Sequence, residues 1–245
     1  MADSTRSNAD RFLAAFRTIE DLLTRDAERN GGNHRRTFGE LVEGSGRPAV
    51  QHFRRELREL QELRNAIVHK ATRDGRPIAE PHDDTVDLIE GIAQRMAEPP
   101  PALTIAARDV IVCHPHDDVG MVAMRMRSRG VSTMPVLDRG EVVGLLTSDT
   151  ITRWMAAELE AGRGLLETAP VREVLAHAEH PDEHAILPQG ASAYEALALF
   201  RRGLESGRTP RAVLITATGT ETGRVQGLLT PADMPRLLEL AGALG

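Results

Sequence analysis

The tetrapeptide GLLT occurs at residues 144–147 and again at residues 227–230. A polar, turn-like stretch precedes each copy, at 138–141 in the first and at 218–224 in the second. Around each copy, short β-like runs and helical patterns follow in the order strand, helix, strand, strand, helix. A unit of this length buries little core alone, so we expect the two copies to pack face to face.

The expected elements follow from apolar runs and helical spacing in each copy of the repeat. For the first copy we predict strands at 110–112, 134–137 and 142–146, and helices at 119–129 and 150–159. For the second copy we predict strands at 185–187, 212–215 and 225–229, and helices at 191–204 and 231–240.

The chain before the repeats is predicted to be helical. Amphipathic or apolar spacing indicates helices at 11–24, 37–42, 50–70 and 83–96. Three consecutive prolines then break the chain, because proline cannot continue a helix and favours an extended linker. The predicted fold is therefore α+β, with an all-α helical bundle followed by a tandem β-α-β-β-α pair. The predicted boundaries are 1–98 for the bundle, 99–101 for the linker, and 102–165 and 166–245 for the two repeats.

Each GLLT copy runs on to an acid, as TSD at 147–149 and as TPAD at 230–233. Such a strand-to-helix turn suits a nucleotide, because the carboxylate accepts from ribose hydroxyls while the Thr hydroxyl and helix amides donate to phosphate. This arrangement resembles the CBS domain family, in which two repeats form a Bateman module. The resemblance implies a regulatory adenine nucleotide of the AMP, ADP or ATP class, with no required cofactor and no metal. The nucleotide-binding residues that it implies are Val112, Val136, Thr147, Asp149, Thr230 and Asp233.

The two copies differ in detail. The second reads Gly-x-x-Thr-x-x-Asp in full, whereas in the first Asp149 comes one position early and Thr150 takes the acidic slot. The first keeps MPV at 134–136 before its hairpin, where the second has RAV at 211–213. We therefore expect one competent nucleotide site rather than two. The TPAD turn at 230–233 also reads as a simple helix N-cap, so both roles are open at this point.

The helix predicted at 50–70 contains the string RNAIVH at 64–69. This R-N-x-x-x-H pattern resembles HEPN domains, which are helical bundles that include metal-independent ribonucleases. The resemblance implies catalytic roles for Arg64, Asn65 and His69, with histidine as the base and arginine balancing charge on the phosphate. On one helix Asn65 and His69 share a face and Arg64 does not. Arg64 converges with His69 either if the helix frays near Val68 or if two protomers pair their motifs. The resemblance implies the second arrangement, a composite site at a dimer interface. Arginine and histidine near a helix C-terminus also stabilise the helix dipole without any catalytic role.

Composition limits the class of function. The chain has 245 residues, 41% of them hydrophobic, and a net charge of −6, which argues against a general nucleic-acid groove and against DNA in particular. A single cysteine excludes an internal disulfide framework and fits a reducing cytoplasm. The polar N-terminal stretch does not read as a secretory signal, and no apolar run is long enough for a membrane span.

Two histidine-containing clusters remain. HPHDD at 114–118 is interpreted as a helix N-cap rather than a metal site, and the histidines at 177, 180 and 184 as part of a polar loop.

These features predict a cytoplasmic, homodimeric regulatory protein. In this hypothesis the CBS pair senses an adenine nucleotide and the HEPN-like domain is the effector, with RNA as its substrate. The alternative is a non-catalytic CBS-domain protein whose helical domain dimerises or docks a partner.

Overall fold

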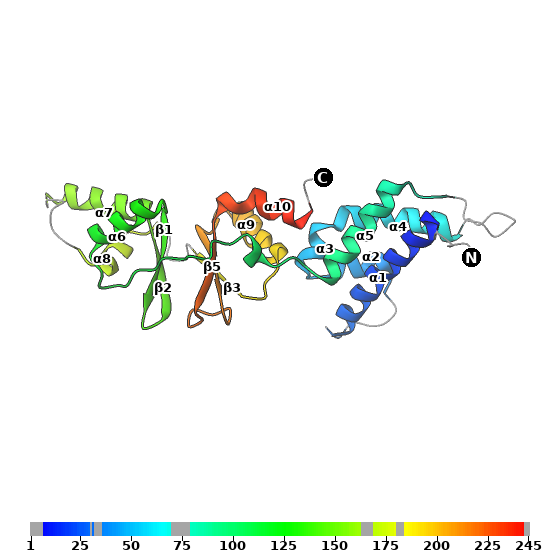
Figure 1. Cartoon of the computed structure of the whole chain (residues 1–245), viewed down its shortest axis with the longest axis horizontal. Coiled ribbons are helices and arrows are strands. Elements are labelled where there is room, and N and C mark those ends of the chain that lie inside the picture. Colours follow the sequence, from blue (N-terminus) through cyan, green and yellow to red (C-terminus); the bar gives the residue numbers. More distant parts are fainter. Residues whose placement is uncertain are drawn as a thin grey trace, which may run out of the picture. The chain divides into compact units, whose positions relative to one another are not determined.

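The computed structural model describes residues 7–29, 31, 36–69, 79–162, 169–179 and 184–242, and the chain divides into two compact units, Met1–Pro100 and Pro101–Gly245. The N-terminal unit is helical, as predicted (Figure 1). Its helices are α1 (Asn8–Arg29), α2 (Phe38–Gly44), α3 (Pro48–His52), α4 (Arg54–His69) and α5 (Asp83–Ala97). Among the described residues, none of these or the later helices combines the length and apolar character that crossing a bilayer requires.

The core of the N-terminal unit lies between α1, α4 and α5. Buried side chains recur at helical spacing, so each helix presents one apolar face to the others. An ion pair also crosses from α1 to α5, with Arg11 Nη2 2.7 Å from Glu90 Oε2. The largest fully buried side chains of these helices are Phe12, Ile19, Leu57, Ile89, Ile92 and Met96.

The helix predicted as one segment at 50–70 is in fact two, α3 and α4. Phe53 interrupts it with φ −98° and ψ 16°, so that α3 ends and α4 starts one residue later. The start of α2 is fixed by a reciprocal cap, because the Glu40 amide donates to Thr37 Oγ1 and the Thr37 amide donates to Glu40 Oε2.

The C-terminal unit contains two small sheets. β1 (Thr133–Asp138) and β2 (Glu141–Thr147) form an antiparallel hairpin, while β3 (His184–Pro188), β4 (Ala212–Thr216) and β5 (Val225–Leu229) form a sheet in which β3 is parallel to β4. Arg139 and Gly140 have φ of 49° and 88°, which is the tight turn that suits a two-residue hairpin. The helices are α6 (Val119–Arg129), α7 (Ser148–Glu160), α8 (Val171–Leu175), α9 (Ala193–Ser206) and α10 (Met234–Ala241), with short 3₁₀ turns η1 (Ala102–Thr104) and η2 (Pro231–Asp233).

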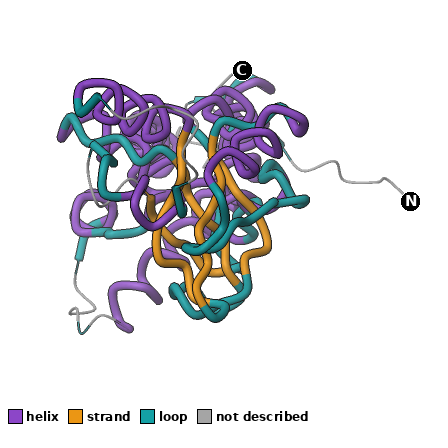
Figure 2. The backbone as a smooth tube through the Cα atoms, turned by 90° about the vertical axis from the view of Figure 1, so that its left-hand side faces the viewer, coloured by secondary structure: helices purple, strands orange, loops and turns teal. Residues whose placement is uncertain are grey.

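The two sheets face each other inside the unit and the helices lie outside them (Figures 1 and 2). Val142 and Leu145 of β2 form one buried cluster with Leu214 and Leu228 of the second repeat. The backbone amide of Val142 also donates to the carbonyl of Glu221, which joins the two hairpins. The expected face-to-face packing of the repeats is therefore observed.

The strand predicted at 110–112 is wrong. Residues 110–112 pair with no strand that the structure describes, and the next residue, Cys113, makes a single parallel bridge to Val136. Val110 packs against the cluster between the sheets and Ile111 against the cluster under α6 and α7. The chain therefore passes from one repeat to the other here and cannot follow β1.

The segment just before this crossing belongs to the second repeat in space. The Ala102 amide donates to the Ala191 carbonyl, and Ala107 and Leu228 exchange backbone hydrogen bonds of 2.9 and 3.0 Å. The second repeat is thus completed by residues distant in sequence.

Candidate functional site

The first strand-to-helix turn joins β2 to α7. Thr147 is buried and caps α7, because its Oγ1 accepts from the Thr150 amide at 3.1 Å and lies 2.9 Å from Thr150 Oγ1. The Ser148 amide donates to the Ser132 carbonyl. These amides of the first turn of α7 are therefore already engaged.

The second turn joins β5 to α10 through η2. Asp233 Oδ2 accepts from both the Thr230 amide, at 2.8 Å, and Thr230 Oγ1, at 3.0 Å. The Asp233 amide donates in turn to the Thr230 carbonyl. Thr230 and Asp233, the two polar residues of the motif, therefore form a local cap in the structure. The Asp233 carboxylate points toward Thr230 of its own turn.

The two turns meet at one cavity of about 290 Å³ in the C-terminal unit. Both repeats contribute to its lining, which is mainly hydroxyl and charged in character. The lining residues are Ser132, Thr133, Thr147, Ser148, Asp149, Arg211, Thr230, Pro231 and Ala232.

Arg211 provides the cation among these lining residues. Its Nη1 lies 3.0 Å from Asp149 Oδ2, and its Nη2 lies 3.5 Å from Glu179 Oε2. Arg153 of α7 holds the same Glu179 carboxylate at 3.0 Å. This chain of ion pairs spans the two repeats at the rim of the cavity. Since the groups are exposed, the pairs are worth at most about 1 kcal/mol each.

The cavity lining contains both donors and acceptors of hydrogen bonds. The Arg211 guanidinium and the hydroxyls donate, and the Asp149 carboxylate accepts. The Ser148 amide already donates to the Ser132 carbonyl and the Thr150 amide to Thr147 Oγ1. A phosphate in this cavity would therefore depend mainly on Arg211 and on the hydroxyls.

The predicted nucleotide-binding residues fall into two groups. Thr147, Asp149 and Thr230 line the cavity, with Asp233 directly behind Thr230. Val136 is fully buried within β1, and the Val112 carbonyl accepts from Arg125, so neither is among the described residues that line the cavity.

Sequence comparison of the repeats missed Arg211 as a cavity residue. It set Arg211 against Met134, and the strand register shows that this is wrong. Met134 pairs with Leu146 and Val213 pairs with Leu229, so Val213 is the counterpart of Met134. Arg211 therefore corresponds to Ser132. Each of them lies one residue before the start of its strand, β4 or β1.

The HEPN-like residues lie on α4 in the N-terminal unit. The Arg64 guanidinium lies 5.8 Å from the centroid of the Phe16 ring and its Nη1 donates to Asn65 Oδ1 at 3.2 Å. His69 is the last residue of α4, and its side chain lies outside the described residues. Arg64 thus packs against Phe16 of α1.

The cluster at 114–118 is a helix cap, as interpreted from the sequence. Asp118 Oδ1 accepts from the Met121 amide at 2.9 Å at the start of α6, and Asp117 Oδ2 accepts from the His114 amide.

Comparisons with known proteins bear on the C-terminal unit. Residues 103–157 match the CBS domain family. The L-aspartate semialdehyde sulfurtransferase of Methanosarcina acetivorans is 31% identical over 71 residues, which are 29% of this chain and only 14% of that protein. The chain therefore resembles a small part of that relative.

Solved structures similar to the chain are mostly CBS domain proteins. Hypoxic Response Protein I with two coordinated zinc ions is 23% identical, covering 56% of this chain and 97% of that one at a TM-score of 0.39. The CBS domain pair of protein MJ0100 in complex with 5′-methylthioadenosine and S-adenosyl-L-methionine is 17% identical, with coverages of 58% and 97% and a TM-score of 0.41. CBSX2 in complex with AMP is 16% identical, with coverages of 56% and 94% and a TM-score of 0.41. From the family match, the C-terminal unit of this chain carries a CBS domain at residues 103–157.

Proposed function

We propose that the C-terminal unit is a CBS pair that senses an adenine nucleotide at the cavity between its two strand-to-helix turns. The observation that carries the proposal is the convergence of both repeated turns on one polar cavity that contains Arg211. The cavity of about 290 Å³ suits a single mononucleotide with part of it left in solvent.

Each polar group has a role in this proposal. Arg211 leaves Asp149 and binds the phosphate, since a guanidinium binds phosphate bidentately. Asp149 is then released to accept from a ribose hydroxyl. Thr147 and Thr230 hold the two turns, and Asp233 acts through Thr230 as a positioning residue.

The test is calorimetric titration of the full chain with AMP, ADP and ATP. We expect Arg211→Gln to weaken binding roughly tenfold to a hundredfold, because one charged hydrogen-bond partner of the phosphate is lost. Arg202→Gln, on the exposed face of α9, is the matched control and should bind like the wild type. The double variant Thr230→Ala, Asp233→Ala should also bind weakly. If it and Arg211→Gln bind as tightly as the wild type, the cavity is not the nucleotide site.

A homodimer is the proposed working form. Large apolar side chains stand exposed on α6 and α7, among them Met121 and Met124 at 57% and 58% exposure and Leu159 at 60%. Met121 and Met124 are three positions apart and so share one face of α6. An exposed apolar face of this kind is typical of surfaces that bind another protein. Sedimentation equilibrium of the wild type and of Met121→Lys, Met124→Lys tests this, with a monomeric variant as the expected result and an unchanged mass as the contrary one.

The proposed effector is the HEPN-like bundle, with RNA as substrate and coupling to the nucleotide through dimer geometry. The observation in its favour is that Arg64 and Asn65 touch on α4, the helix that ends at His69. Metal-free RNA cleavage should be present in the wild type and absent in His69→Ala. If both proteins cleave equally, or neither cleaves, the helical unit is instead a non-catalytic docking or dimerisation domain.

A further inference from the structure

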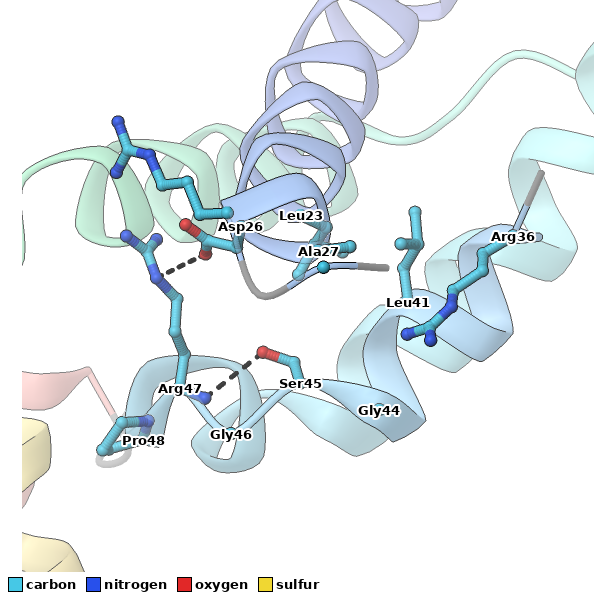
Figure 3. Close-up of a pocket in the computed structure, with 12 residues that line it drawn as sticks. Leu23, Asp26, Ala27, Arg36, Leu41, Gly44, Ser45, Gly46, Arg47 and Pro48 are labelled. Atoms are coloured by element: carbon cyan, nitrogen blue, oxygen red, sulfur yellow. Dashed lines mark hydrogen bonds and ion pairs between the residues drawn. The ribbon is translucent and has the colours of Figure 1, made fainter. Parts of the chain in front are cut away.

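A larger cavity, of about 500 Å³, lies entirely within the N-terminal unit (Figure 3). Its walls come from the end of α1, the end of α2 and the turn that leads into α3. This volume is in the range of cavities that hold small organic ligands. The lining residues are Leu23, Asp26, Ala27, Arg29, Gly31, Arg36, Leu41, Gly44, Ser45, Gly46, Arg47 and Pro48.

The charge of this lining is strongly positive. Among the described lining residues are three arginines, Arg29, Arg36 and Arg47, and one carboxylate, that of Asp26, whose Oδ2 lies 2.5 Å from Arg47 Nε. That pair fixes the Arg47 guanidinium at one wall, with its remaining N–H groups available to a further acceptor.

Two acids at the ends of α2 are engaged with groups outside the lining. The carboxylate of Glu43 pairs with Arg54 and Arg58, and that of Glu40 accepts from Thr37.

The arginines stand on opposite sides of an apolar floor. Figure 3 shows the Arg36 and Arg47 side chains reaching in from different segments, with Leu23 and Leu41 between them. Leu23 and Leu41 are 2% and 7% exposed, so the floor is part of the core. A Cβ on Gly44 would lie 3.4 Å from Arg36 Nη1, which places this guanidinium over the end of α2.

A simpler role for these arginines is to stabilise the C-terminal ends of α1 and α2. That role explains any one of them at a helix end. It does not require three to line the same hollow beside a hydrophobic floor, where their mutual repulsion costs stability unless an anion is bound.

We propose that this cavity binds an organic phosphate of about mononucleotide size, with its phosphate on Arg36 and its apolar part over Leu23 and Leu41. Arginine suits the planar, bidentate recognition of phosphate oxygens. Ala27 and Pro48, which are half-buried and also line the cavity, supply apolar contact that an inorganic anion cannot use. This site does not depend on the nucleotide cavity of the C-terminal unit.

Phenyl phosphate is the probe, with phenol and inorganic phosphate as partial probes, all applied to the full chain. Hydrogen exchange should show protection by phenyl phosphate in peptides covering 23–29 and 36–48, and little or none by phenol. The readout is local, so binding in the C-terminal unit is distinguished directly.

A pair of arginine variants completes the experiment. Arg36→Gln should weaken phenyl phosphate binding roughly tenfold or more, because a charged partner of the phosphate is lost. Arg17→Gln removes an exposed arginine of α1 that does not line the cavity, and should bind like the wild type. The proposal is overturned if these peptides gain no protection, if phenol protects them equally, or if Arg36→Gln binds as well as Arg17→Gln.

Discussion

The glycines of the two GLLT copies occupy equivalent positions but different surroundings. A Cβ on Gly227 would lie 2.9 Å from Ala106 Cβ and 2.9 Å from Leu103 Cδ2, because the segment before the crossing packs against β5. A Cβ on Gly144 would lie 3.4 Å from Leu175 Cδ1, an ordinary contact. We therefore predict that Gly227→Ala destabilises the C-terminal unit and that Gly144→Ala does not.

The magnitude follows from two opposing effects. Overpacking a close-packed site costs about 1–3 kcal/mol, and here the Leu103 methyl can turn aside while the Ala106 methyl cannot. Replacing glycine by alanine also restricts the unfolded chain, which stabilises the fold by about 0.4–1 kcal/mol. The net expectation is a loss of about 1–2 kcal/mol for Gly227→Ala, and no loss or a slight gain for Gly144→Ala.

Urea unfolding of the full chain measures this difference. Trp154 and Tyr194, the single tryptophan and the single tyrosine, both lie buried in the C-terminal unit, so intrinsic fluorescence reports that unit alone. With a urea dependence of about 2 kcal/mol per molar, the midpoint of Gly227→Ala should fall by roughly 0.5–1 M. An equal loss in both variants, or an unchanged midpoint for Gly227→Ala, would refute the reasoning.

Three further predictions concern single side chains. Burial raises the pKa of the Cys113 thiol to about 12, so a disulfide reagent at mildly alkaline pH should label it only after unfolding; labelling of the folded chain at the rate of a free thiol would contradict this. The hydrogen bond from the Thr37 amide lowers the pKa of Glu40 below its usual 4.5, so Glu40 stabilises the fold above that pH and this contribution is lost as the pH falls through the lower, folded-state pKa. The difference in melting temperature between wild type and Glu40→Gln should therefore shrink between about pH 6 and about pH 3, and a constant difference would count against it. Ser192→Ala removes the reciprocal cap at the start of α9 and should lower the free energy of unfolding by about 1 kcal/mol, measured in urea. An unchanged midpoint would show that the cap does not stabilise the fold.

Much of the fold follows from local signals. The helix at 119–129 begins and ends where the Asp118 cap and Gly130, with φ of 64°, place it, and both signals are readable in the sequence. The repeated GLLT correctly places β2 and β5 and the turns that follow them, because a strand that ends in a capping threonine is a local feature.

Other features depend on contacts between distant segments. The apolar run at 110–112 has strand-like residues, yet it crosses between two clusters because its partners are fixed by the tertiary structure. Arg211 was misaligned because the two hairpins differ in length: Val136 and its partner Gly144 are eight positions apart, whereas Ile215 and its partner Gly227 are twelve apart. Motif spacing alone does not reveal this difference, and the Arg211–Asp149 pair follows only from the folded register.

The crossing of residues 101–107 to the second repeat has a consequence for how the protein is made. These residues leave the ribosome early, but Leu228, the backbone partner of Ala107, is translated more than a hundred residues later. At about 5–20 residues per second, the delay is roughly ten seconds. During that time Ala102 and Ala106, both buried in the finished fold, have no native partner strand to cover them. Residues 101–107 are thus the part of the nascent chain for which we expect chaperone binding until Leu228 has been made.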